Sequence, residues 1–368
     1  MRIVVIGDIG VTDQVIHIGD EAMFEELVHQ LTSRGAEVTA ISSNPTDTSS
    51  RYSVTAVDRQ ELDAGGIAEV VRASDAVVIA GGGNLASNWP EHIRLRSTLG
   101  ELAAQHSKPI VISGQTIGPW LTDQDADAVS ELLGSAQLVG VREPASFDLA
   151  LALGVDPRRL VSTIDDASFL AADAATPPAA PYCLVSLSLH TADIPRQRFA
   201  SLMAALLDHV ASTTGLDIRF LAHFGSTRPG VVMGDAAVHA EVAGLMSSPS
   251  SEVALTDASS AAAWARGAEL VLTSRYHPAV FAVSAGVPTI GIHVDEYTRV
   301  KLTGALGNFG QSSVLAGSDL DAAPELVSRV WSDRARIRAA GRTRAAVNRA
   351  SSDEWWDRLW SALSAPQR

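Results

Sequence analysis

Residues 268–283 read AELVLTSRYHPAVFAV. The apolar run 268–272 is typical of a buried strand, and the run after Pro278 is typical of a helix that has proline at its first position. Arg275 and His277 are therefore predicted to lie on a strand-to-helix turn. In an open α/β sheet such a turn lies at the carboxyl ends of the strands, where free backbone N–H groups and the positive helix end favour anionic ligands.

The two polar side chains of this turn suit an anionic substrate. A guanidinium group recognises carboxylate or phosphate through paired hydrogen bonds, and an imidazole can transfer a proton near neutral pH. For an isolated Arg-x-His the commoner explanation is structural, with Arg275 paired to a carboxylate and His277 capping the helix. The rest of the chain has to decide between these explanations.

The composition limits the classes of protein to consider. The chain has 368 residues and a formal net charge of −14, with 46% hydrophobic residues. This length predicts two domains, and the acidic balance argues against nucleic acid as a partner. The single cysteine, Cys183, excludes an internal disulfide, no apolar run is long enough for a membrane span, and the chain enters a strand directly. Together these features predict a cytoplasmic protein.

Short apolar runs alternate with helical segments through residues 1–172, and the alternation restarts over residues 182–320. This pattern predicts an α/β protein with two Rossmann-like, doubly wound domains that face a cleft, as in the glycosyltransferase-B fold. The Pro- and Ala-rich residues 173–181 are the expected linker. Residues 225–251, around a short helix expected at Asp235–Leu245, are predicted to be a surface loop or, alternatively, a mobile flap over the cleft.

The last segment, residues 321–368, is predicted to be a helical tail. Apolar side chains recur at helical spacing at Trp356, Leu359, Trp360 and Leu363. We expect this stripe to pack on one of the domains. The alternative, a peripheral membrane contact through the aromatic residues, is less favoured.

Three glycine-bearing segments follow predicted strands of the first domain. They are Gly81-Gly82-Gly83-Asn84, Gly114-Gln115-Thr116-Ile117-Gly118-Pro119 and the segment from His17 to Ala22, in which Asp20 suits a helix N-cap. Glycines at strand ends let a ligand approach the backbone, and amide side chains can donate and accept hydrogen bonds. Neither the dinucleotide fingerprint nor the P-loop occurs. Three such segments at one sheet edge predict a binding cleft.

Other polar residues allow more than one explanation. Arg142 follows a predicted strand and precedes Pro144, so it either adds a second guanidinium to the cleft or pairs with a neighbouring carboxylate. Asp165 and Asp166 could form a metal site or a proton-handling pair, but a helix N-cap and a solvent-exposed carboxylate are favoured. The histidines lack a third partner at zinc-site spacing and there is no G-x-S-x-G motif, so neither a metal nor a serine nucleophile is expected.

These motifs, taken in order, resemble the polysaccharide pyruvyl transferase family. The resemblance runs through Gly19-Asp20-Glu21-Ala22, the two glycine segments at 81–84 and 114–119, Val141-Arg142-Glu143-Pro144-Ala145-Ser146, Asp165, Ser274-Arg275-Tyr276-His277 and Ala285-Gly286-Val287-Pro288. It implies that the protein moves the enolpyruvyl unit of phosphoenolpyruvate onto a sugar-containing acceptor as a pyruvate ketal and releases phosphate. The C-terminal domain would be the donor side and the N-terminal domain the acceptor side.

The resemblance also assigns roles to residues. Arg142, Arg275, His277 and the backbone of Tyr276 would hold the donor, and the N-terminal loops, with Gly82, Gly83, Asn84 and Gln115, would receive the sugar. The chain departs from the family at three places. Other members often have asparagine in place of His17 and often have an arginine where this chain has Ser186-Leu187-Ser188. Tyr297 and Lys301 are one residue further apart than the corresponding pair usually is.

The residue types fit this chemistry. Arg142 and Arg275, assisted by Lys301 or Arg299, would neutralise the carboxylate and phosphate of the donor. His277 would protonate its methylene carbon as the general acid, and Asp20 or His17, less favourably Asp165, would be the base. No cofactor is expected. The alternatives are a nucleotide-sugar-dependent glycosyltransferase or epimerase, and a non-catalytic sugar-binding or assembly protein.

Overall fold

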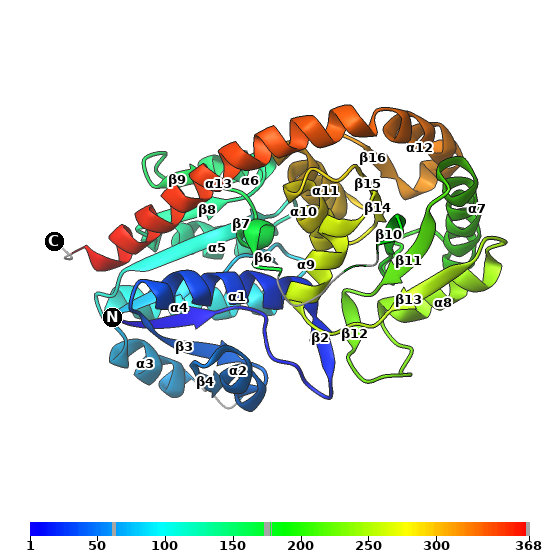
Figure 1. Ribbon diagram of the computed structural model, residues 1–368. Coiled ribbons are helices and arrows are strands. Elements are labelled where there is room, and N and C mark those ends of the chain that lie inside the picture. Colours follow the sequence, from blue (N-terminus) through cyan, green and yellow to red (C-terminus); the bar gives the residue numbers. More distant parts are fainter. Residues whose placement is uncertain (61–63, 173–176, 178, 366–368) are drawn as a thin grey trace. The chain divides into compact units, whose positions relative to one another are not determined.

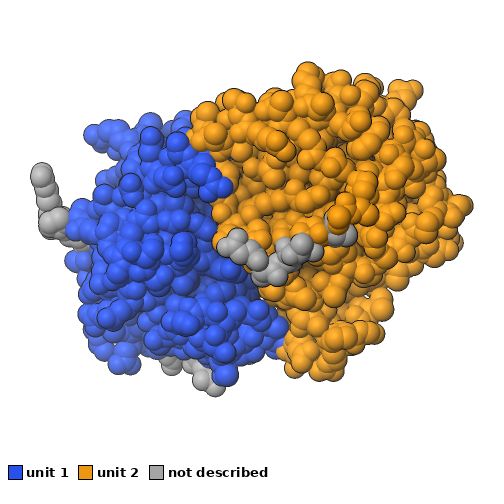
Figure 2. All heavy atoms as spheres, in the orientation of Figure 1, with its two compact units in different colours: residues 1–12, 20–167, 349–368 blue, residues 13–19, 168–348 orange. Residues whose placement is uncertain are grey.

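The computed structural model describes residues 1–60, 64–172, 177 and 179–365. They form two compact units, which Figure 2 shows in different colours. Unit 1 contains residues 1–12, 20–167 and the described residues from 349 onward, and unit 2 contains residues 13–19 and 168–348. The structure thus assigns residues 13–19 to the second unit, although the sequence placed them in the first domain. The predicted linker, residues 173–181, lies largely outside the described residues.

Unit 1 is built on a parallel sheet with the strand order β4-β3-β1-β5-β7-β8-β9, in which β6 pairs with β7 (Figure 1). Its strands are β1 Arg2–Ile6, β3 Glu37–Ser42, β4 Thr55–Asp58, β5 Ala76–Ile79, β6 Gly82–Leu85, β7 Ile110–Ile117, β8 Leu138–Val141 and β9 Leu160–Ser162. Its helices are α2 Pro45–Tyr52, α3 Ala64–Ala73, α4 Pro90–Gln105, α5 Asp123–Ser135 and α6 Pro144–Ala152, together with most of α1 Ile18–Ser33 and the end of α13 Arg334–Ser364.

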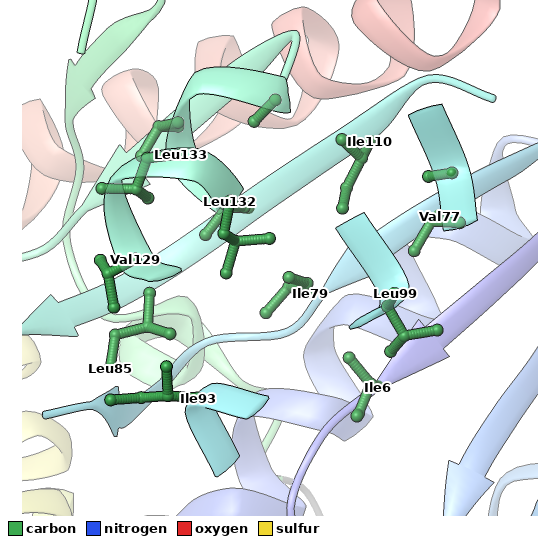
Figure 3. Close-up of a cluster of buried hydrophobic side chains, with 14 of the residues drawn as sticks. Ile6, Val77, Ile79, Leu85, Ile93, Leu99, Ile110, Val129, Leu132 and Leu133 are labelled. Atoms are coloured by element: carbon green, nitrogen blue, oxygen red, sulfur yellow. The ribbon is translucent and has the colours of Figure 1, made fainter. Parts of the chain in front are cut away.

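Both faces of this sheet are buried, because successive side chains of a strand point to opposite faces. Along β1, Val4 and Ile6 join one core cluster, whereas Ile3 and Val5 join the other. Figure 3 shows the first cluster, in which strand residues pack against α4 and α5; the labelled side chains are Ile6, Val77, Ile79, Leu85, Ile93, Leu99, Ile110, Val129, Leu132 and Leu133.

The second cluster of unit 1 contains the end of α13. Trp355 and Trp356 are 4% and 2% exposed there, and Leu359 and Leu363 are also buried. The predicted packing of the tail stripe on a domain is therefore confirmed. The alternative of an aromatic membrane anchor is contradicted for these two tryptophans. In the described part of the chain, no helix combines the length and apolar character of a membrane span.

Unit 2 is built on a second parallel sheet, with the strand order β13-β11-β10-β14-β15-β16 (Figure 1). Its strands are β10 Tyr182–Ser186, β11 Asp217–Leu221, β13 Ser250–Val253, β14 Leu270–Thr273, β15 Thr289–His293 and β16 Val314–Ala316, beside an antiparallel pair of β2 Val15–His17 and β12 Phe224–Ser226. Its helices are α7 Arg196–Thr214, α8 Asp235–Leu245, α9 Ala258–Gly267, α10 Tyr276–Ser284, α11 Glu296–Asn308, α12 Ala323–Ser332 and the first part of α13; the short 3₁₀ segments are η1 Asp166–Phe169 and η2 Gly317–Ala322. The predicted class, two Rossmann-like α/β units, is confirmed.

Each sheet has a point at which the chain reverses its direction of growth. In unit 1 the chain builds outward from β1 through β3 and β4 and then returns to β5; in unit 2 it builds from β10 through β11 and β13 and then returns to β14. Ligands of open α/β sheets bind at the carboxyl ends of the strands beside such a switch point. The two positions to examine are therefore the ends of β1 and β5 in unit 1, and the ends of β10 and β14 in unit 2.

Candidate functional site

The Arg275–His277 turn lies at the switch point of unit 2. It follows β14 directly, and Arg275 is the N-cap residue of α10. The helix begins at Tyr276, so the prediction that Pro278 is its first residue is wrong by two positions. Proline is tolerated there because the N–H groups of a first helical turn have no acceptor within the helix.

Arg275 is held by a buried carboxylate. Its Nε and NH2 donate to Asp235, at 2.9 Å to Oδ2 and 2.5 Å to Oδ1 respectively. Asp235 is fully buried and also accepts the backbone N–H groups of His223 and Phe224. The Arg275 side chain remains 21% exposed. The predicted structural ion pair therefore exists, and it fixes a guanidinium whose NH1 group makes no hydrogen bond to Asp235.

Asp235 was not identified from the sequence. It is the first residue of α8, whose bounds match the helix expected inside residues 225–251. The interpretation of this segment as a surface loop or mobile flap is wrong at this residue, since its carboxylate is among the most enclosed of the unit. The only signal in the sequence was an acidic residue at a helix start after Gly234.

His277 lies in the first turn of α10 and is 6% exposed. Its ring packs directly against the Cα of Gly19, where a Cβ atom would overlap the imidazole. Gly19 belongs to unit 2 with strand β2, which pairs with β12. The glycine of the Gly-Asp-Glu-Ala motif is thus required by the close approach of His277.

Replacing Gly19 by alanine is expected to destabilise the protein by about 1–3 kcal/mol, since the new methyl group overpacks against His277. Gly134 is a matched control, because it also lies in a helix and a Cβ atom there meets no neighbour within 4 Å. Alanine at Gly134 is expected to raise stability by up to about 1 kcal/mol. Urea unfolding measures both changes. Equal changes in the two variants would contradict the packing described here.

Lys301 reaches the same turn from α11. Its Nζ lies 4.9 Å from the ring centroid of Tyr276 and donates to the Tyr297 hydroxyl at 3.2 Å. Tyr297 and Lys301 are four residues apart, so they share one face of the helix. The longer Tyr–Lys spacing of this chain therefore still brings the ammonium group to the Arg275–His277 turn. Arg299 instead pairs with Glu296 on the exposed side of the helix.

The end of β10 completes the edge of unit 2. The Ser188 backbone N–H donates to Ser274 Oγ at 2.8 Å. Residues 186–188, where an arginine is often expected, therefore lie beside the Arg275–His277 turn. Burial lowers the pKa of the neighbouring His223 to about 3, which keeps this imidazole neutral. Its Nδ1 lies 3.1 Å from Ser186 Oγ.

In unit 1 the residues predicted to receive the sugar lie on two paired strands. Gly82, Gly83 and Asn84 belong to β6, and Gln115 belongs to β7 opposite Gly82. The prediction of a loop at 114–117 is wrong, because β7 continues to Ile117 and is buried throughout. Gln115 donates to the Ala80 carbonyl at 2.5 Å. Its Oε1 and the Nδ2 of Asn84 have no hydrogen-bond partner among the described residues.

Two of the glycines make room for a protein side chain. A Cβ atom at Gly81 or Gly114 would lie 2.9 Å from the carboxyl group of Asp166. We expected these positions to let a ligand approach the backbone, but here the nearest group is Asp166 itself. This carboxyl is buried and accepts from Ser113 Oγ at 3.0 Å, so the prediction of a solvent-exposed Asp166 is also wrong.

Arg142 lies inside unit 1 and is 1% exposed. Its Nε donates to Thr116 at 2.9 Å and to Glu143 at 3.2 Å, and its NH1 donates to Asp165 at 2.5 Å. Asp165 in turn accepts the N–H of Ala167, which matches its predicted role as a cap. This geometry favours a structural role for Arg142; its donor-binding role stays a prediction.

The other two candidate bases lie at the start of α1. The helix begins at Ile18, so Asp20 is in its first turn and is not its N-cap. His17 ends β2 and lies 5.8 Å from the ring of Phe224. The buried carboxylate of this motif is Glu21, which accepts from the Gly10 N–H and from the Tyr52 hydroxyl.

Burial and the charge of Asp165 raise the pKa of Asp166 from 3.8 to about 8. The folded protein therefore keeps a proton that the unfolded chain releases between pH 4 and 8, and stability falls as pH rises through this range. Compared with Asp166→Asn, the wild type is expected to lose up to about 1.4 kcal/mol per pH unit there. Urea unfolding across pH 4–8 measures the difference. Parallel profiles for the two proteins would contradict a buried, protonated Asp166.

Solved structures share this fold at low sequence identity. A protein from Anabaena, HepE, in complex with UDP and glucose, aligns with a TM-score of 0.64 at 10% identity and covers 98% of this chain and 100% of its own. The UDP-GlcNAc 2-epimerase of Neisseria meningitidis, bound to UDP-GlcNAc, aligns with a TM-score of 0.63 at 9% identity, again with 98% and 100% covered. The glycotransferase of kitacinnamycin aligns with a TM-score of 0.57 at 15% sequence identity, and the alignment covers 98% of each chain.

These similarities show the fold alone, of the glycosyltransferase-B-like class. Among curated protein sequences none matches the chain significantly. The family model for polysaccharide pyruvyl transferase matches residues 17–296. The matched range includes strands β6 and β7 of unit 1 and the Arg275–His277 turn of unit 2. The chain belongs to the polysaccharide pyruvyl transferase family.

Proposed function

We propose that this protein transfers the enolpyruvyl unit of phosphoenolpyruvate to two hydroxyl groups of a sugar-containing acceptor, forming a pyruvate ketal and releasing phosphate. The observation that carries the proposal is the convergence of Arg275, His277 and Lys301 at the amino end of α10, beside the switch point of unit 2. Two cations and a helix N-terminus match the carboxylate and phosphate of this donor.

In this scheme Arg275 and Lys301 bind the anionic groups of phosphoenolpyruvate. Asp235 fixes the plane of the Arg275 guanidinium, so less freedom is lost when the donor binds. The backbone N–H of Tyr276, in the first helical turn, is a further donor toward an oxyanion. Arg142 is held by Asp165 inside unit 1, and this scheme does not require its predicted contact with the donor.

His277 donates a proton to the methylene carbon of the donor, which becomes a methyl group while positive charge develops at the neighbouring carbon. An acceptor hydroxyl attacks that carbon and loses its proton to a base, for which Asp20 and His17 are the candidates. The C–O bond to phosphate then breaks. A second hydroxyl attacks the same carbon, and its proton leaves with the phosphate.

The acceptor is proposed to contact unit 1 at β6 and β7. Asn84 and Gln115 leave one donor and one acceptor atom without a partner among the described residues. A sugar hydroxyl both donates and accepts, so it complements this pair. We place the reaction in the cytoplasm, in keeping with a single buried cysteine.

The test is turnover with a panel of sugars and glycans. With phosphoenolpyruvate, at least one acceptor is expected to gain the mass of pyruvate less water, with one phosphate released per ketal. UDP-GlcNAc is offered in parallel under the same conditions. Conversion of UDP-GlcNAc without consumption of phosphoenolpyruvate would replace the proposal with a nucleotide-sugar enzyme. Binding of both ligand types without chemistry would indicate a sugar-binding protein.

A further inference from the structure

A group of basic side chains surrounds one carboxylate at the switch point of unit 1. Asp8 follows β1 by two residues, and its carboxylate lies 3.2 Å from Arg59 NH1, 2.9 Å from His92 Nδ1 and 3.5 Å from Arg96 NH2. Arg59 follows β4 directly, and His92 and Arg96 lie one turn apart on α4. These four residues, the Asp8 cluster, come from three segments that meet at the carboxyl edge of the sheet.

The cluster carries more positive than negative charge. Burial alone would raise the pKa of Asp8, but the charge of Arg96 and the hydrogen bond from His92 lower it to about 2, so the carboxylate is ionised. Two guanidinium groups therefore face one carboxylate, even with His92 neutral. By contrast, Arg2 of the same unit pairs with a carboxylate of its own, Asp75. In a chain with a net charge of −14, this local excess favours an anionic ligand.

Arg96 adds an independent sign of a missing partner. Its side chain is 1% exposed, and its Nε has no hydrogen-bond partner among the described residues. Buried polar groups are nearly always hydrogen-bonded, and an arginine in particular presents a fork suited to oxyanions. Arg59 and His92 remain 31% and 25% exposed, so the cluster is accessible to a ligand from solvent.

An exposed tryptophan adjoins the cluster, and a second lies on a loop tied to the same segment. Trp89 is 46% exposed, and its ring lies 6.3 Å from that of His92 in an edge-on arrangement. Trp120 is 57% exposed, and its backbone carbonyl accepts the N–H of Ser87, which ties its loop to the segment carrying Trp89. Exposed aromatic rings with a polar N–H are typical of binding surfaces, and their flat apolar faces suit the C–H face of a sugar ring.

We propose that the carboxyl edge of unit 1 binds an acceptor glycan that carries an oxyanion, a phosphate or a uronate carboxylate, with the oxyanion held by Arg59, Arg96 and His92. The sugar ring next to the oxyanion packs against Trp89. This inference rests on the proposed function, because it takes the bound glycan to be the acceptor, and it narrows the acceptor from any glycan to an anionic one.

Calorimetry at low ionic strength tests the site with four probes: glucose 1-phosphate, glucuronate, inorganic phosphate and glucose. At least one of the two anionic sugars is expected to bind more tightly than glucose, and their relative affinities identify the preferred oxyanion. Arg59→Gln is expected to weaken the binding of that anionic sugar by about tenfold, because one charge-assisted contact is lost. Arg59 is chosen because the buried Arg96 also supports the fold.

Arg94→Gln is the matched control, since Arg94 lies on the same helix, is 64% exposed and pairs with Glu91. It is expected to change affinity less than twofold. Trp89→Ala is expected to weaken the binding of the anionic sugar by about tenfold and to leave the affinity for inorganic phosphate unchanged. Circular dichroism of each variant confirms folding.

Equal affinity for glucose and both anionic sugars, or equal losses in the Arg59 and Arg94 variants, would overturn the site. Inorganic phosphate that binds as tightly as glucose 1-phosphate would overturn the sugar contact. A phosphoenolpyruvate titration run alongside separates the two proposals. If an anionic sugar binds in a way that depends on Arg59 but phosphoenolpyruvate does not bind, the proposed donor is wrong and the glycan site stands. If phosphoenolpyruvate binds but no anionic sugar does, the glycan site is wrong and the proposed donor stands.

Discussion

Asp235→Asn is expected to weaken phosphoenolpyruvate binding by about 10- to 100-fold. Asparagine can still accept the backbone N–H groups of His223 and Phe224, but it cannot neutralise Arg275 or hold both of its donors. Loss of this charge-assisted pair also lowers stability by about 1–3 kcal/mol, because Asp235 is fully buried while Arg275 is 21% exposed. The measurements are the KM for phosphoenolpyruvate and the free energy of unfolding.

Two further variants separate positioning from stability. Asp217→Asn breaks the exposed Asp217–Arg219 pair of the same unit and is expected to change stability by less than about 1 kcal/mol. Asp235→Glu keeps the charge and is expected to recover part of the affinity. A folded Asp235→Asn protein with wild-type KM would show that Arg275 does not need this anchor.

His277→Gln is expected to lower kcat by about 10²- to 10⁴-fold, the usual contribution of a general acid. Affinity for phosphoenolpyruvate should change much less, because Arg275 and Lys301 supply the anion contacts. Phosphate release in the presence of the sugar panel measures the rate. His209→Gln, on α7 of the same unit, is the control and should retain full activity. Undiminished phosphate release by the His277 variant would mean that another group delivers the proton.

The sequence predicted much of the fold because the signals were local. The strand at 268–272 and the helix that follows it could be recognised from apolar runs and from Pro278. The carboxyl-edge position of Arg275 followed from the α/β pattern alone. The predicted helix starts were too late by about half a turn. Helix α10 begins at Tyr276 and not at Pro278, and α1 begins at Ile18, before its expected cap at Asp20.

The partners of the site residues could not be predicted, because they depend on packing between distant segments. Asp235 precedes Arg275 by 40 residues and meets it only through the approach of α8 to the end of β14. Likewise, Gly114 suggested an open loop, but it belongs to a strand on which Asp166 packs. Glycine-rich strand ends indicate a close approach without specifying whether a ligand or a protein side chain makes it.

The central claim is that the Arg275–His277 turn binds phosphoenolpyruvate. Calorimetric titration of the wild-type protein with phosphoenolpyruvate, and separately with UDP, tests it without knowledge of the acceptor. The account predicts saturable binding of one phosphoenolpyruvate per chain that UDP does not displace at equal concentration. Tight binding of UDP with no heat from phosphoenolpyruvate would contradict it.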